Sequence, residues 1–398
     1  MEADVRIPSE DDREQIARVL STSLNFPLDG ALERKDRFPI EDMRAAYVDG
    51  IVAATAGEFR FTQWFGRRGL ACSGVWGVAT VPERRGTGLA SATVGAVMDM
   101  ARDRGDPLTA LYPAVLEPYR SLGYELAGTW DAHRIALDAL PVPSRRDLPQ
   151  VRLVDPDRDL DDVMACFSRW ARTNDGAVEP DARFWRQRLL ERPWDDTFRA
   201  VVVDDRGRIT GAASFTRTAD ASGHLDIGFG LEHLVFVTED APALDAMIAY
   251  ARGHRGVGRW LQWVGAPNDP LTLLVGVQAV EVHQRYRWML RLLDVPAAFA
   301  GRGYPAIDAG ATFAVEDPRY PANAGPWTLE VRGGEPTVRP AAGHDRRPVP
   351  ITALSSMFTG YLRPRDAVRL GILDADDPAV EALSALLAGP DPWCPFFF

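Results

Sequence analysis

The chain has 398 residues, enough for two or three domains, and its 46% hydrophobic and 25% charged residues are ordinary for a globular protein. A net charge of −11 argues against general nucleic-acid or anionic-membrane binding, and three widely separated cysteines argue against a disulfide framework or a cysteine metal site. With no basic, apolar leader and no run of 18 apolar residues, we expect a cytoplasmic protein with no membrane span and no bound metal.

The start of the chain carries a pattern that returns later. Residues 5–24 (VRIPSEDDREQIARVLSTSL) predict a short strand, an acidic turn and an amphipathic helix, and residues 151–170 (VRLVDPDRDLDDVMACFSRW) predict the same three elements. The similarity indicates an internal repeat, so we expect two related domains in tandem.

Residues 75–105 (VWGVATVPERRGTGLASATVGAVMDMARDRG) are the most informative stretch of the chain. Val75 to Val81 is an apolar, β-branched run that predicts a buried strand, and Pro82 ends it because proline cannot donate to the hydrogen-bond ladder. Apolar residues then recur at helical spacing, and Gly105 is a suitable C-terminal stop. The predicted order is therefore strand, glycine-rich turn, helix.

The turn between these elements, Arg85-Gly86-Thr87-Gly88-Leu89-Ala90, is suited to a pyrophosphate. A helix N-terminus has unpaired N–H groups and partial positive charge, glycines let the backbone approach a phosphate closely, and arginines add charge. The spacing fits neither the dinucleotide-binding fingerprint nor the Walker loop. The alternative is an ordinary strand-to-helix turn with solvated arginines, and spacing alone leaves it open.

The same turn resembles the Q/R-x-x-G-x-G/A pattern of GNAT-superfamily acetyltransferases. The resemblance implies acetyl-CoA as the co-substrate. In such enzymes the preceding strand splays from its neighbour and its backbone binds the pantetheine arm; here Val78 and Thr80 would supply those groups. The residues implied to surround the pyrophosphate are Arg84, Arg85, Gly86, Gly88, Leu89 and Ala90.

Residues 108–124 (LTALYPAVLEPYRSLGY) predict a strand, a short helix and the start of another strand. The Tyr-x-x-Leu-Gly-Tyr element resembles the GNAT segment that places a tyrosine near the CoA sulfur. A tyrosine with a pKa near ~10 can protonate a departing thiolate. Tyr119 is the better match for this acid, while Tyr124 is predicted to pack at the strand start. The alternative for Tyr119 is a helix tyrosine whose hydroxyl points to water.

Residues 231–256 again predict a strand that runs into a helix. Here Glu239-Asp240-Ala241-Pro242 takes the place of the phosphate-binding turn, and its acidic side chains would repel a pyrophosphate. We therefore expect one active and one degenerate acetyltransferase domain.

Residues 288–304 (WMLRLLDVPAAFAGRGY) resemble a signature of the enhanced-intracellular-survival (Eis) family of acetyltransferases. The resemblance covers essentially the full length and implies an α/β (α+β) chain of three domains. These are a catalytic GNAT domain at 1–145, a degenerate GNAT-like domain at 146–290 and a sterol-carrier-protein-like α+β domain at 291–398. We expect the third domain to be a structural cover, because nothing in it specifies a lipid ligand. The resemblance also implies a homo-oligomer, a hexamer.

The chain ends in DPWCPFFF, an unusually apolar terminus. In the resembled family the C-terminal carboxylate reaches the first domain's active site, so the resemblance implies the main-chain carboxylate of Phe398 as the base. Phe396, Phe397 and Phe398 would anchor the tail, at roughly 1.5–3 kcal/mol for each ring fully buried. No histidine is an obvious base, since His133 is predicted to lie in a strand beyond the tyrosine segment. The alternative is a tail that packs on its own domain without chemistry.

Departures from the family bear on the acceptor. Members that acetylate aminoglycosides have an acidic residue just before the last phenylalanine, where this chain has Phe397, and another in an early helix-loop, where this chain has Phe26. Because buried ammonium groups need charged partners, the loss of these acids favours a less charged, more apolar amine. The predicted substrate-binding residues are Phe26, Trp64 and Phe397, although aromatic residues there suit a core or a lid equally well.

Two functions of different classes follow. The first is an acetyl-CoA-dependent N-acetyltransferase that acts on a primary amine of a small molecule, either an aminoglycoside-like or a less charged amine. The amine attacks directly in a ternary complex, since no motif places a cysteine or serine nucleophile. The second is a non-catalytic protein that binds acyl-CoA or a lipid as a carrier. The phosphate-binding turn together with Tyr119 favours the enzyme, because a carrier would not need the tyrosine.

Overall fold

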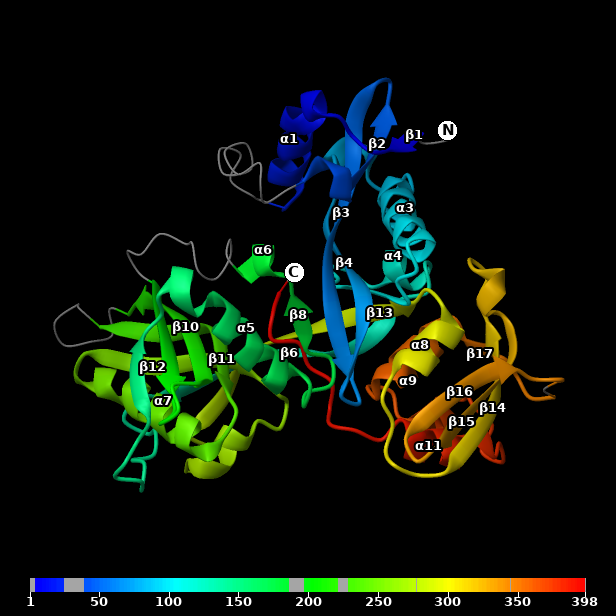
Figure 1. Cartoon of the computed structure of the whole chain (residues 1–398). Helices are drawn as coiled ribbons and strands as arrows, with labels where there is room; N and C mark the ends of the chain where they lie inside the picture. The colour runs from blue at the N-terminus through cyan, green and yellow to red at the C-terminus, as the bar shows by residue number, and fades with distance from the viewer. Residues whose placement is uncertain are drawn as a thin grey trace.

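The computed structural model describes residues 4–24, 39–185, 197–220, 228–276, 278–343 and 345–397. In the first part of the chain, β3 and β4 form a long hairpin and α3 packs across β2, β3 and β4 (Figure 1). The described elements there are β1 (Asp4–Arg6), α1 (Arg13–Leu24), β2 (Met43–Val48), β3 (Ile51–Phe65), β4 (Arg68–Thr80), α3 (Leu89–Asp103), β5 (Leu108–Leu111), α4 (Glu117–Arg120) and β6 (Glu125–Ala136). The predicted order of strand, glycine-rich turn and helix is confirmed.

The middle of the chain repeats this plan. Its elements are β7 (Gln150–Leu153), α5 (Pro156–Ala171), β8 (Val178–Pro180), α6 (Ala182–Phe184), β9 (Thr197–Val203), β10 (Ile209–Ala219), β11 (Phe229–Thr238), α7 (Ala241–Gly253), β12 (Gly258–Gly265) and β13 (Val280–Leu292). β11 and β12 are parallel, as β4 and β5 are, and α7 connects them as α3 connects the first pair. The expected internal repeat is therefore present.

The two halves share one 13-stranded sheet, in the order β1-β2-β3-β4-β5-β13-β6-β12-β11-β10-β9-β7, with β8 paired to β3. β13, from the second half, lies beside β5 of the first half, with Leu290 opposite Ala110. β6, from the first half, lies beside β12 of the second half, with His133 opposite Trp263. β13 and β6 also pair with each other, so each half completes its sheet with the last strand of the other half.

The end of the chain forms a smaller unit, with a sheet in the order β16-β15-β14-β17 and helices packed on it (Figure 1). Its elements are α8 (Val295–Gly301), β14 (Ala309–Glu316), β15 (Gly325–Arg332), β16 (Glu335–Pro340), β17 (Val349–Pro350), α9 (Ile351–Thr359), α10 (Pro364–Arg369) and α11 (Ala379–Leu386). Its core is continuous with that of the first half, since the ring centroids of Phe358 and Phe65 are 5.3 Å apart. No helix in the described part of the chain is long and apolar enough to cross a membrane.

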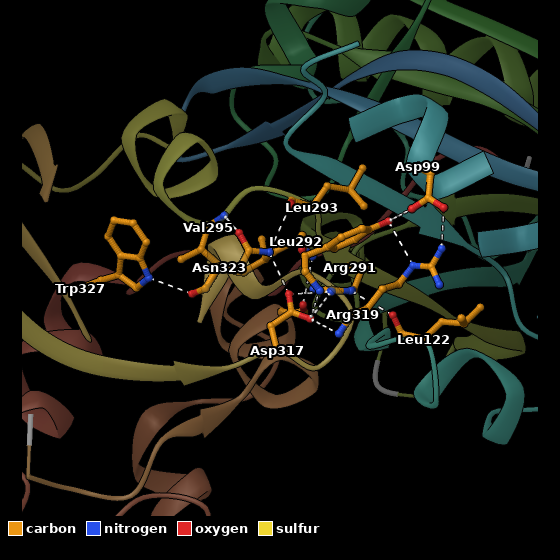
Figure 2. A network of polar contacts seen from close by, with 12 residues as sticks. Asp99, Leu122, Arg291, Leu292, Leu293, Val295, Asp317, Arg319, Asn323 and Trp327 are labelled. Carbon is orange, nitrogen blue, oxygen red and sulfur yellow. Dashed lines mark hydrogen bonds and ion pairs between the residues drawn. The ribbon is translucent and has the colours of Figure 1, made fainter. Parts of the chain in front are cut away.

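A buried polar network ties this third unit to the first (Figure 2). Arg291 of β13 and Asp317 are fully buried, with 2.7 Å between guanidinium nitrogen and carboxylate oxygen. Asn323 donates its side-chain amide to Asp317 (2.9 Å), and Arg319 pairs with Asp99 of α3 (2.7 Å). Because the loss of one partner would leave a buried charge uncompensated, the Arg291–Asp317 pair fixes the third unit against β13, and the partly exposed Arg319–Asp99 pair adds a contact with α3.

Candidate active site

The candidate active site begins where β4 and β5 separate. Their parallel register ends at Val75 opposite Leu111, and β4 continues to Thr80 after β5 has stopped. The edge of β4 that faces β5 therefore loses its partner over the last residues of the strand. An extended ligand could pair with the backbone there, as another strand would.

A β-bulge at Gly77, which has a φ of +60°, sets how the end of β4 faces this opening. Val81 donates its N–H to Ala53 of β3 (2.9 Å). By strand alternation, the main-chain groups of Val78 and Thr80 then point the other way, into the opening. The carbonyl of Thr80 already accepts a hydrogen bond from the Ser23 hydroxyl at the end of α1 (3.0 Å). A ligand that binds this carbonyl would therefore lie next to the end of α1.

The N-terminus of α3 opens at the same place. Its N-cap residue is Gly88, with a φ of +84°, and no side chain caps the helix. Gly86 also has a positive φ (+76°), and a Cβ built on either glycine meets no atom within 4 Å. The first amides of a helix have no intrahelical acceptor, so here they are available to an anion.

The corresponding helix of the second half is closed to an anion. Asp240 caps α7 by accepting a hydrogen bond from the N–H of Ala243 (2.8 Å). Glu239 is held by Arg169 at 2.6 Å and by Arg208 at 3.3 Å, so the cations beside this turn are already paired. The acidic turn therefore has a structural role, which agrees with a degenerate second domain.

A pocket of about 620 Å³ occupies the opening, large enough for much of a small cofactor. Arg84 and Arg85 both line it, and the side chain of Arg84 is only loosely paired, 3.8 Å from Asp49. The lining also includes every other residue predicted to bind the cofactor: Val78, Thr80, Gly86, Gly88, Leu89 and Ala90. An uncapped helix end, two arginines and an exposed strand edge fit a ligand with an extended arm and a pyrophosphate.

Tyr119 of α4 lines the same pocket and is only 9% exposed. Burial raises the pKa of its phenol, so the hydroxyl keeps its proton well into the alkaline range. Tyr124 is fully buried, shares a hydrogen bond of 3.0 Å with the Thr109 hydroxyl, and is not among the lining residues. The two tyrosines of the motif thus have different surroundings, and Tyr119 is the one that faces the pocket.

The C-terminal tail runs from the third unit and ends near β8 and α6 (Figure 1), and none of its described residues lines the pocket at the end of β4. Thr129 of β6 donates its N–H to the carbonyl of Pro392 (3.1 Å) and accepts a hydrogen bond from the N–H of Cys394 (2.9 Å). Trp393 donates its N–H to the main-chain carbonyl of Asp175 (3.0 Å). These contacts set the register of the tail, because main-chain hydrogen bonds on both sides allow no sliding by one residue.

Two phenylalanines end the described chain. Phe396 is 6% exposed, and its carbonyl accepts a hydrogen bond from the Tyr112 hydroxyl (2.9 Å), one residue after β5. Phe397 stacks on Tyr112, with ring centroids 4.2 Å apart, yet it is 52% exposed. Anchoring by burial is therefore confirmed for Phe396 and wrong for Phe397, while Phe398 lies outside the described residues. The rings around Phe396 are those of Phe167, Phe184 and Trp185.

Models of known families match the chain in three places. A GNAT acetyltransferase domain matches residues 4–127, a second GNAT acetyltransferase domain matches residues 176–292, and a sterol carrier protein domain matches residues 295–395. An uncharacterized N-acetyltransferase of Streptomyces griseus is 26% identical over the whole of both chains. The chain is a tandem GNAT N-acetyltransferase.

Solved structures extend this family assignment to the complete architecture. A GCN5-related N-acetyltransferase from Anabaena variabilis has a TM-score of 0.92, with 24% identity and full coverage of both chains. Eis1 from Mycobacterium abscessus has a TM-score of 0.82, with 22% identity, and the match covers 99% of this chain and 100% of Eis1. The GNAT enzyme therefore has an Eis-like fold, with a sterol-carrier-like domain as its third unit. GNAT acetyltransferases use acetyl-CoA, and the pocket at the end of β4 fits that co-substrate.

The other residues predicted to bind the acceptor lie as follows. The indole N–H of Trp64 in β3 donates to Glu179 (2.9 Å), and the guanidinium of Arg172 lies 5.2 Å from the ring centroid. Trp64 thus packs where β3 meets the second half of the enzyme. Phe26 lies outside the described residues. His133 is buried, stacks on Trp263 at 5.3 Å and contacts the carbonyl of Ala266, so it has a packing role between the exchanged strands.

Sequence patterns did not indicate an aromatic row that joins β4 to the tail. Trp76 of β4 stacks on Phe59 (5.1 Å), Phe59 meets Phe184 of α6 edge-on (6.4 Å), and Phe184 meets Phe396 (5.5 Å). The row includes residues from both GNAT domains and the tail. Each looks like an ordinary core residue in its own segment, so only the packing of the GNAT enzyme reveals the row.

Proposed function

We propose that this enzyme transfers an acetyl group from acetyl-CoA to a primary amine of a small molecule, by direct attack of the amine on the thioester in a ternary complex. The observation that carries the proposal is the uncapped N-terminus of α3, which opens into a pocket that Tyr119 also lines. The same element of the second domain is capped by Asp240. Within the described residues, the features that suit an acyl-CoA site therefore lie in the first domain.

In this proposal each residue at the pocket has one task. Arg84, Arg85 and the amides at Gly86 to Ala90 hold the pyrophosphate, and the main chain of Val78 pairs with the pantetheine arm. As the C–N bond forms and the C–S bond breaks, Tyr119 gives its phenolic proton to the sulfur. Because burial raises its pKa, the phenol still carries this proton at neutral pH when the C–S bond begins to break.

The carboxylate of Phe398 receives the amine proton in this proposal. Phe397, the preceding residue, stacks on Tyr112 directly after the end of β5, where the two strands part. Tyr286 meets Phe397 from another side, at 5.6 Å between ring centroids. An apolar site would raise the pKa of this carboxyl and make the carboxylate a better base than a free terminus, whose pKa is about 3.3–3.7.

The aromatic row supports an acceptor that is more apolar than a polycationic sugar. Trp76, Phe59 and Phe184 connect β4 to Phe396 of the tail through ring contacts, and Phe397 contributes a half-exposed ring. Flat apolar faces favour an amine with an aromatic or aliphatic body, and cation–π contacts can still orient one ammonium group. Assembly into a hexamer, which the family resemblance implies, remains a prediction from the sequence.

The test is thiol release from acetyl-CoA with a panel of amines. One enzyme form has the native terminus, and the other is extended past Phe398 by a short Gly-Ser tail. We expect the native form to turn over apolar primary amines, and the extended form to bind CoA with unchanged affinity but to lose most of its kcat. Equal activity of the two forms would show that the base lies elsewhere, and activity confined to aminoglycosides would contradict the proposed acceptor class.

A further inference from the structure

Asp175, which the function above does not use, lies where the three domains and the tail meet. Its side chain is buried, and its main-chain carbonyl accepts the hydrogen bond from Trp393 in the tail (3.0 Å). One carboxylate oxygen accepts a hydrogen bond from the N–H of Gly66, in the β3–β4 hairpin (2.7 Å). A residue of the second domain thus contacts the first domain with its side chain and the tail with its main chain.

The third domain contributes Arg302, which directly follows α8 and is 1% exposed. Its guanidinium lies 3.9 Å from the other carboxylate oxygen of Asp175, and it donates a hydrogen bond to the carbonyl of Phe358. Its Nε has no acceptor within the described residues. A cation with so few partners remains buried only where a counter-charge is near, and Asp175 supplies that charge.

The backbone of the tail packs closely against neighbouring glycines, at positions where a side chain would not fit. A Cβ on Gly176 would lie 2.9 Å from the carbonyl oxygen of Trp393, and a Cβ on Gly128 would lie 2.6 Å from that of Pro392. A Cβ on Gly389 would lie 2.6 Å from the Asp175 carboxylate. The backbone of the tail therefore lies against the backbone of both GNAT domains, and a shift of the turn at Asp175 must move Trp393.

We propose that Asp175 and Arg302 are positioning residues that hold the C-terminal tail in register with the active site. Neither touches a reacting group. Arg302 and Gly66 fix the Asp175 side chain from two domains, and Asp175 in turn fixes Trp393, five residues before the terminus. The consequence for catalysis rests on the proposed role of the Phe398 carboxylate, whereas the consequence for tail position does not. The third domain is then more than a cover, because it anchors the segment that enters the active site.

Asp175→Asn tests the proposal, because the amide keeps the shape of the side chain and the main-chain carbonyl but removes the charge that Arg302 needs. Tail position is read without any assay of activity, by the rate at which carboxypeptidase A releases phenylalanine from the folded full-length enzyme. We expect release to become about 10-fold faster, since cleavage follows the population of the open tail. We also expect kcat to fall by a similar factor, with the KM for acetyl-CoA unchanged.

Arg302→Gln perturbs the same contact from the third domain and should give the same pattern. The matched control is Arg319→Gln, which removes another contact of the third domain with a carboxylate, Asp99 of α3, but has no contact with the tail. Thermal unfolding and CoA binding identify variants that remain folded. Unchanged phenylalanine release in folded Asp175→Asn and Arg302→Gln, or equal acceleration in the control, would overturn the proposal. Faster release with an unchanged kcat would support the positioning role and instead refute the terminal carboxylate as base.

Discussion

At the scale of single residues, the two tyrosines of one short motif allow a matched test of the proposed acid. Tyr119 lines the pocket, and burial raises its pKa above the ordinary value of about 10. The protonated form is the active one, so its fraction falls only as pH rises through this raised pKa. We expect kcat of the native enzyme to show no alkaline decline below pH ~10, and Tyr119→Phe to lower kcat by about 10²-fold at every pH below that.

Tyr124→Phe is the control, because Tyr124 is buried but does not line the pocket. Its hydroxyl bonds Thr109 at 3.0 Å, so its loss should lower the free energy of unfolding by roughly 1 kcal/mol and leave kcat unchanged. Rate profiles from pH 6 to 10.5 and denaturant titrations measure both effects. If the two variants had the same kcat, the sulfur would take its proton from another donor.

At the scale of elements, the two related helices α3 and α7 differ at the N-cap residue, and we propose that this difference governs phosphate binding. Gly88 leaves the amides of α3 open, whereas Asp240 caps α7. Gly88→Asp places a carboxylate where the pyrophosphate is proposed to bind, and we expect the KM for acetyl-CoA to rise about 10- to 100-fold. Gly88→Asn has nearly the same shape and tolerates the left-handed backbone, so it separates charge from conformation. An equal rise in both variants would mean that shape, and not charge, is responsible.

Some elements of the fold could be predicted from the sequence, and others could not. The strand, turn and helix around Arg85 were predictable, because strand propensity, a proline stop and helical spacing all act within 31 contiguous residues, 75–105. The pairing of β13 with β5 could not be predicted. It places Leu290 opposite Ala110, and any apolar strand could pair with the edge of β5 equally well. The contact of Asp175 with Trp393 is similarly remote in sequence, and although Trp393 lies in the apolar terminal stretch, nothing near Asp175 indicates its partner. The chemistry of the turn around Arg85 could be inferred from one short segment. The contacts that position the tail could not, because they depend on packing between domains.

At the scale of the whole molecule, the exchanged strands make the two GNAT domains one cooperative unit. Without β13, the edge of β5 and one edge of β6 would lose their main-chain partners, and without β12 the other edge of β6 would also be open. Unpaired sheet edges with apolar faces lead to aggregation rather than to a stable domain. A fragment of residues 1–145 has β5 and β6 but lacks both β12 and β13.

We therefore expect the fragment of residues 1–145 to be insoluble or to lack a cooperative unfolding transition, although it contains the whole acetyl-CoA loop. The full chain should unfold the two GNAT domains in a single transition, with tryptophan fluorescence and far-UV circular dichroism giving coincident curves in denaturant. The control is the full chain, which supplies β12 and β13 together with Asp317, the buried partner of Arg291, and should bind CoA. A folded, CoA-binding fragment of residues 1–145 would contradict the argument, because the first domain would then not need the strand that it receives from the second.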